Sequence, residues 1–143
     1  MKPVKLFTIL FAGLVSMTLA ATFNPPYDPN APDPNAPGDW FNTANWSNGQ
    51  IPKLDGVFHS FANNAKGAVS GEGKNALCTK LRLPTGNLLV IENGATYTTN
   101  DYVDVGFEVN GDSTIRVQNA TYIGKKLNVG VSGAGAKGTA IFE

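Results

Sequence analysis

"LVIENGATYTTNDYVDVG", residues 89–106, and "IRVQNATYIGKKLNVG", residues 115–130, decide the fold of this chain. The two stretches share alternating apolar side chains, one asparagine, the tripeptide Ala-Thr-Tyr and an ending of the form apolar-x-Val-Gly. Equivalent positions lie about 24–26 residues apart, from Val103 to Leu127 at the short end and from Leu89 to Ile115 at the long end. One unit of this length cannot cover its own apolar face, so neighbouring units must stack. The repeat therefore predicts a β-solenoid.

The rest of the chain after residue 56 fits the same pattern. Short alternating apolar runs are separated by Gly and Asn, helical periodicity is missing, and charged residues make up only 15% of the sequence. Leu81-Arg82-Leu83 resembles the end of an earlier copy, and Gly138-Thr139-Ala140-Ile141 the start of a later one. Asn at a repeated corner suits the left-handed backbone region. We expect an all-β fold with solenoid coils over residues 57–143, and an antiparallel sandwich is the alternative.

The amino terminus has the order of a secretory signal peptide. Lys2 and Lys5 form a basic start, an apolar run follows, and small residues lead to Ala20. Cleavage after Ala20 is predicted, with Ala21 as the second choice, so residues 1–20 are the expected leader. The apolar run is short for a bilayer span, and a retained membrane anchor is the alternative.

Residues 21–37 are rich in proline and asparagine, and the pentapeptide Asp-Pro-Asn-Ala-Pro occurs twice in succession, at 28–32 and 33–37. Proline removes backbone donors and disfavours helix at the residue before it. We therefore expect residues 21–37 to form an extended, solvated spacer outside the core.

Both tryptophans of the chain lie in "GDWFNTANWSNGQIP", residues 38–52. A solenoid exposes apolar side chains and unpaired strand edges at its ends, and these must be covered. A segment with Trp40, Phe41 and Trp46 just before the first coil suits that role, with Pro52 ending the turn that follows. Residues 38–56 are therefore predicted to be an aromatic amino-terminal cap.

This arrangement resembles a known family of bacterial secreted proteins. The pattern Trp40-x5-Trp46-Ser47-x-Gly49-x2-Pro52 is similar to the W…NWS.G..P segment that precedes autotransporter-associated β-strand repeats and the repeats of PEP-CTERM-type surface proteins. The coils from residue 89 onward are similar to the coils of those proteins. The resemblance implies a right-handed parallel β-helix in a secreted or surface-exposed structural module, and it supplies no catalytic residues. Such proteins usually have many coils, whereas this chain has two clear ones, so we expect it to be the beginning of a longer protein.

Sugar binding is the main functional alternative. Exposed tryptophans can stack on pyranose rings while carboxylate and amide groups bind hydroxyls. Trp40, Trp46, Asp39 and Asn45 could form such a site. The sugar site and the cap are compatible only if one of the two rings stays exposed.

Catalytic signals are weak. His59 is the single histidine, expected on the outward face of a strand, and Cys78 the single cysteine, expected to be a small buried hydrophobe. Asp101 and Asp104 could meet Lys125 and Lys126 of the next coil, as in β-helix enzymes that cleave polysaccharides. A solvated ion pair between coils explains the same four residues without chemistry. We expect no enzyme activity, no cofactor and no metal site.

Charge also limits the partners. Without Lys2 and Lys5 the chain has 9 basic and 11 acidic residues, which gives a net charge near −2. Nucleic acid and anionic membranes are therefore poor partners. We expect a secreted or cell-surface structural or adhesive module that contacts surface glycans or other proteins, with the membrane involved only through the leader or a later anchor. Self-association through the open end of the solenoid is a further expectation.

Overall fold

The computed structural model describes residues 20–26, 33, 36–131 and 134–143. The expected leader therefore lies outside the described residues except for Ala20, as does the greater part of the two proline-rich pentapeptides. Among the described residues the only helix is the short 3-10 helix η1 (Thr43–Asn45), and the remaining elements are strands.

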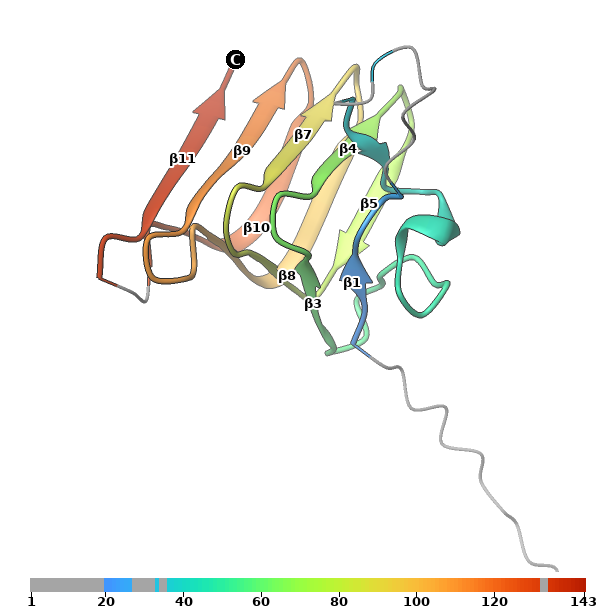
Figure 1. Cartoon of the computed structure of the whole chain (residues 1–143). Coiled ribbons are helices and arrows are strands. Elements are labelled where there is room, and N and C mark those ends of the chain that lie inside the picture. Colours follow the sequence, from blue (N-terminus) through green and yellow to red (C-terminus); the bar gives the residue numbers. More distant parts are fainter. Residues whose placement is uncertain (1–19, 27–32, 34–35, 132–133) are drawn as a thin grey trace, which may run out of the picture.

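The strands form two sheets that wind around one shared core, and every paired strand in both sheets is parallel to its neighbour (Figure 1). The first sheet contains β1 (Thr22–Phe23), β3 (Phe58–Phe61), β5 (Asn75–Cys78), β6 (Lys80–Leu83), β8 (Thr96–Val105) and β10 (Thr121–Val129). The second contains β2 (Gly38–Asp39), β4 (Lys66–Ser70), β7 (Leu88–Glu92), β9 (Asp112–Gln118) and β11 (Lys137–Phe142). The chain passes from one sheet to the other and back, and each pass lies on the one before, so the predicted β-solenoid is confirmed.

The stacking register follows the sequence repeat. Leu89 of β7 pairs with Ile115 of β9, and Tyr97 of β8 pairs with Tyr122 of β10. The earlier and later copies are also confirmed, because β6 stacks on β8 and β11 stacks on β9. Side chains one coil apart therefore occupy equivalent positions, and a repeat of similar residues becomes a continuous internal stack.

Asparagine and glycine turn the corners. Asn93 and Asn119 have φ of 57° and 45°, inside the left-handed region that the sequence pattern predicted for them. Gly106 directly follows β8 and has φ of 69°, and its N–H donates to the Leu83 carbonyl of the preceding coil. A Cβ atom at Gly106 would overlap the carbonyl oxygen of Lys137, so glycine is required there for space as well as for conformation.

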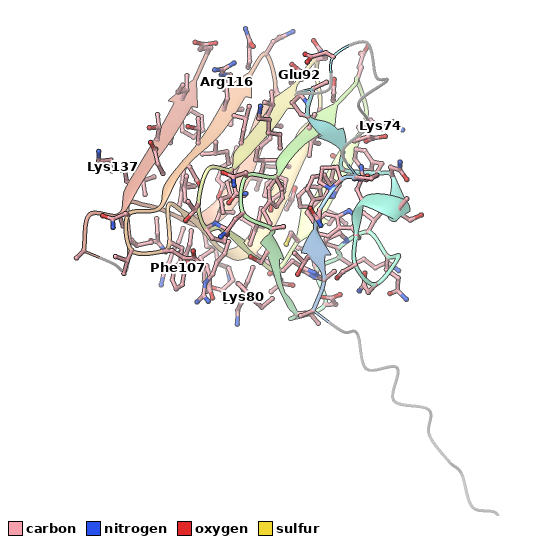
Figure 2. The ribbon with its side chains drawn as sticks, in the orientation of Figure 1. Lys74, Lys80, Glu92, Phe107, Arg116 and Lys137 are labelled. Carbon is pink, nitrogen blue, oxygen red and sulfur yellow. The ribbon has the colours of Figure 1, made fainter. Side chains whose placement is uncertain are left out.

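Alternate side chains of β3, β4, β5, β6 and β9 enter the core, as in β9, where positions 113, 115 and 117 are buried. Cys78 is one of the buried residues, as predicted, and burial raises its pKa to about 12. Figure 2 shows charged side chains such as Lys80, Glu92 and Lys137 projecting outward from the ribbon. The core is thus mainly apolar, and these charged side chains lie on its outside.

The expectation of a solvated spacer from residue 21 was wrong for its first part. Thr22–Phe23 form β1, which pairs with β3, and Phe23 is completely buried. The Asn24 N–H also donates to the Asn45 carbonyl. The proline-rich composition of residues 21–37 gave no indication of this short strand, because its two residues precede Pro25, the first proline of that stretch.

Candidate functional site

The two tryptophans lie together inside the amino-terminal end of the solenoid. Their rings are 4.7 Å apart at an interplanar angle of 78°, and the Trp46 indole Nε1–H donates to the Trp40 carbonyl at 2.9 Å. Phe23 of β1 packs 4.9 Å from Trp46, and Tyr97 packs edge-on at 5.4 Å from Trp40. We call Phe23, Trp40, Trp46 and Phe61 the aromatic cluster, and it lies at the β1 and β3 end of the first sheet.

Polar groups around the aromatic cluster hold the backbone in place. The Asn45 side-chain amide donates to the Asp39 carbonyl, and the Asp39 carboxylate accepts from the Phe41 N–H. Pro52 is buried at the end of this segment, while Phe41 is half-buried beneath the Lys74 ammonium group. These hydrogen bonds lie within the turn itself and give it a fixed shape.

The sugar-binding alternative at these residues loses its basis. Trp40 and Trp46 are 0% and 3% exposed, so neither ring can stack on a sugar. Asn45 is also buried, and of the four proposed ligand-binding side chains only that of Asp39 is exposed. The structure thus brings the four residues together around a closed aromatic cluster.

The predicted partners of Asp101 and Asp104 were wrong. Asp101 pairs with Lys80 at 3.6 Å, and Asp104 accepts from Arg82 at 3.3 Å and from Asn128 at 2.8 Å. These are ion pairs between neighbouring coils, as the non-catalytic interpretation expected, but their basic partners come from the preceding coil. The reason is the register, which sets Asp104 directly opposite Arg82.

Arg82 is also held by two rings. Its guanidinium carbon lies 4.6 Å from the Phe58 ring centroid and 3.7 Å from that of Phe107. Such cation–π contacts fix the long side chain over the outer face of the first sheet. The Arg82 guanidinium is thus held by the Asp104 carboxylate and by two aromatic rings.

The expectation that His59 faces outward was wrong. His59 is 1% exposed, because its pairing with Leu81 places it at a core position of β3. Its Nδ1 atom accepts the Ala21 N–H at 3.2 Å, and its ring lies 6.1 Å from Trp46. The sequence carried one signal for this, namely that His59 and Phe61 share the same parity along the strand.

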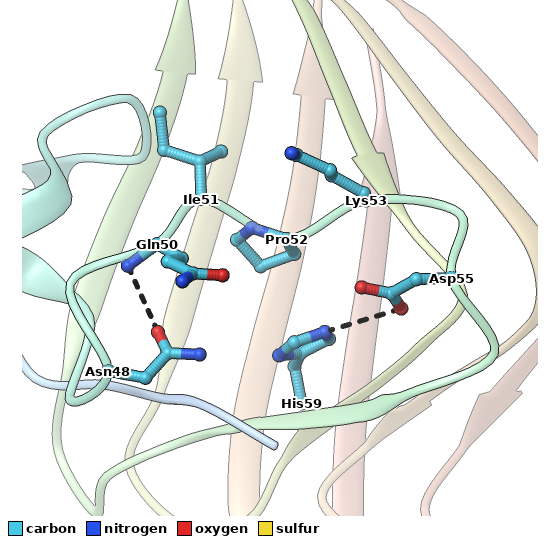
Figure 3. Close-up of a pocket in the computed structure, with 7 residues that line it drawn as sticks. All are labelled: Asn48, Gln50, Ile51, Pro52, Lys53, Asp55 and His59. Carbon is cyan, nitrogen blue, oxygen red and sulfur yellow. Dashed lines mark hydrogen bonds and ion pairs between the residues drawn. The ribbon is translucent and has the colours of Figure 1, made fainter. Parts of the chain in front are cut away.

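A pocket of about 130 Å³ opens beside His59 (Figure 3). Its lining residues are Asn48, Gln50, Ile51, Pro52, Lys53, Asp55 and His59. The loop between Trp46 and β3 provides six of them, and β3 provides the histidine. This pocket is the candidate site, and analysis of the sequence missed it because it depends on how that loop folds back.

The electrostatics of the pocket centre on the histidine and one carboxylate. His59 Nε2 is buried and has no hydrogen-bond partner, and it lies 4.0 Å from Asp55 Oδ1. Burial lowers the pKa of His59, and the Asp55 carboxylate opposes this by favouring the charged imidazole. The pocket therefore presents a neutral imidazole next to a carboxylate.

The described residues contain no group of three or more His, Cys, Asp or Glu side chains that could hold a metal ion. In the same residues no helix has the length and apolar character to cross a membrane. The search of family models, curated proteins and solved structures found no match to this chain.

Proposed function

We propose that the chain is an exported, non-catalytic β-solenoid module with a structural or adhesive role at the cell surface. The observation that carries the proposal is the in-register stack of parallel coils, which is covered by the aromatic cluster at one end and presents β10 and β11 at the other. Parallel strands bonded on successive coils make a stiff element whose outer faces can contact other molecules.

The boundary between exposed and buried residues supports export. Ala20 is exposed, whereas Ala21 is buried and bonded to His59 and Ser60. Removal of residues 1–20 would therefore leave the folded core complete from its first residue. The resemblance to secreted β-helix repeat proteins points in the same direction.

The outer faces support contact rather than chemistry. On the face of the first sheet Lys80 pairs with Asp101, and Arg82 pairs with Asp104 and stacks on Phe107. Pairing offsets part of the cost of desolvating these charges when another surface approaches. Structural or adhesive contact does not require an ionised catalytic group.

Cell fractionation with amino-terminal sequencing tests the proposal. We expect a mature chain that begins at Ala21, whose nitrogen donates to His59 Nδ1, and that is cleaved when protease is added to intact cells. Leu10→Arg places a charge in the apolar part of the leader and should leave uncleaved protein inside the cell. Leu54→Arg adds the same charge at a residue that is 43% exposed and should not change export. Uncleaved wild-type protein protected inside the cell would refute the proposal.

A further inference from the structure

The hydrogen bond at His59 Nδ1 fixes the proton of the imidazole. A neutral imidazole has one donor and one acceptor nitrogen, and Nδ1 accepts from the Ala21 N–H. The proton must therefore be on Nε2. Because Nε2 is buried and unpartnered, the pocket contains a hydrogen-bond donor that lacks an acceptor. A buried N–H group without an acceptor costs free energy of folding, unless a group in the pocket accepts a hydrogen bond from it.

The neighbouring carboxylate defines what that acceptor must be. The 4.0 Å between His59 Nε2 and Asp55 Oδ1 is too long for a direct hydrogen bond. One oxygen atom lying beside both could accept from Nε2–H and donate to the carboxylate. A hydroxyl group or a water molecule does both, whereas an anion would be repelled by Asp55 and an ammonium group cannot accept.

The remaining lining selects a neutral ligand with several polar groups. The Lys53 ammonium balances the Asp55 carboxylate, so with neutral His59 the charged groups of the lining sum to zero. Ile51 and Pro52 contribute an apolar surface beside these polar groups. A pocket of about 130 Å³ exceeds the roughly 10–15 Å³ that one water needs, so it has room for a ligand group with several heavy atoms.

We propose that the Asp55–His59 pocket binds the hydroxyl-bearing edge of a neutral sugar unit. One hydroxyl bridges His59 Nε2–H and the Asp55 carboxylate, Lys53 donates to a second oxygen, and the C–H face of the ring lies against Ile51 and Pro52. This site is separate from the buried tryptophans. The proposal rests on the proposed adhesive function in that it names a glycan as the class of molecule contacted, although binding can be measured without reference to export.

Nuclear magnetic resonance titration of the purified full-length chain tests the proposal. The probes are the methyl glycosides of glucose, galactose, mannose and N-acetylglucosamine, with acetate and methylammonium as ionic comparisons. We expect the His59 imidazole to show the Nε2–H tautomer and at least one glycoside to shift that proton saturably, with a dissociation constant on the order of 1 mM. Acetate and methylammonium should not shift it.

A pair of matched variants locates the binding. Asp55→Asn should weaken glycoside binding about tenfold or more, because a hydroxyl loses its charged acceptor. Asp101→Asn makes the same change on the outer face and should leave affinity within about twofold, since Asp101 does not line the pocket and its carboxylate is paired with Lys80. If Asp55→Asn does not fold, the wild-type Nε2–H shift still decides the question.

Failure of this inference is distinguishable from failure of the proposed function. If no glycoside moves the His59 Nε2–H signal, only water occupies the pocket and the sugar site is refuted, while export remains to be judged by fractionation. Equal loss of binding in Asp55→Asn and Asp101→Asn would also refute the site. Conversely, sugar binding by a chain that stays inside the cell would support the site and refute the surface role.

Discussion

The first and the last coil of this chain differ in how far their apolar side chains are buried. At the amino-terminal end Trp40 and Phe23 are completely buried, and three separate segments contribute rings to one cluster. At the other end Ile123 and Phe142 are 53% and 58% exposed on the last strands of the two sheets. Between them, each coil contacts chiefly the coils directly above and below it.

The difference shows that two kinds of interaction hold this fold together. The coils depend on a repeated register, in which each residue meets its counterpart one coil away. The aromatic cluster adds contacts outside this register, such as the antiparallel bridge between Phe23 and Trp46, to the in-register pair of Phe23 and Phe61. Perturbing one residue of each kind should therefore give unequal losses of stability.

The largest loss is expected from Trp40→Ala. Removing a completely buried indole should cost about 3–5 kcal/mol of the free energy of unfolding. Phe142→Ala removes a ring that is 58% exposed and should cost less than about 1 kcal/mol. Urea denaturation followed by circular dichroism measures both. Equal losses would mean that the two ends are not as different as their burial indicates.

Gly106→Ala tests the coil register and is expected to come next. The new methyl group meets the Lys137 backbone in addition to the strain of positive φ, so the loss should be about 2–4 kcal/mol. Gly49 also has positive φ but has no atom within 4 Å of the added group. Gly49→Ala should therefore cost only about 1–2 kcal/mol. If the two variants unfold at the same urea concentration, close packing between coils is not what requires glycine.

Asp104→Asn probes the charged contacts between coils. Asp104 is 5% exposed and accepts from Arg82 and Asn128, so the loss should be about 1–3 kcal/mol. Asp101→Asn affects an exposed pair with Lys80 and should cost less than about 1 kcal/mol. A salt titration of both unfolding transitions separates them further, because only the exposed pair is strongly screened.

The pH dependence of stability should reveal His59, with the smallest effect. Burial lowers the pKa of His59 in the folded chain, whereas the unfolded chain keeps the usual value of about 6.5. As the pH falls through 6.5, the unfolded state takes up the proton first, and stability decreases until the folded-state pKa is reached. The slope cannot exceed about 1.4 kcal/mol per pH unit for one group.

His59→Asn provides the control for this pH effect. The asparagine amide oxygen can replace Nδ1 as acceptor for the Ala21 N–H, but it does not titrate. The variant should therefore lose the decrease in stability below pH 6.5, while Asp55 and Lys53 still face the pocket. A variant with the same decrease as the wild type would assign it to other groups.

Several features of the fold could be predicted because they depend on nearest-neighbour repetition. The alignment of residues 89–106 with 115–130 gave the coil length and the register that the structure shows, for example Tyr97 on Tyr122. The left-handed corners at Asn93 and Asn119 followed from the same alignment. In a solenoid each sequence repeat forms one coil. An alignment of the repeats therefore predicts both the coil length and the register between coils.

The candidate site could not be predicted in the same way. His59 stands in a strand without a clear apolar alternation, and its inward orientation becomes clear only when β3 is paired with β6. The position of Asp55 beside it depends on the path of the loop that follows the aromatic cluster. Neither feature is repeated along the chain, so no alignment within the sequence reveals it.

The sequence alone determined the class of fold, the coil length and the residues that turn the corners, because these follow from alternation, period and backbone preference. Only the tertiary structure decided that Phe23 belongs to the core, that both tryptophans are buried, and that His59 and Asp55 share a pocket. The physical reason is the range of the contacts. A repeat records contacts between equivalent residues one coil apart. The aromatic cluster instead joins three separate segments, and the pocket depends on how the loop of residues 48–55 folds back onto His59.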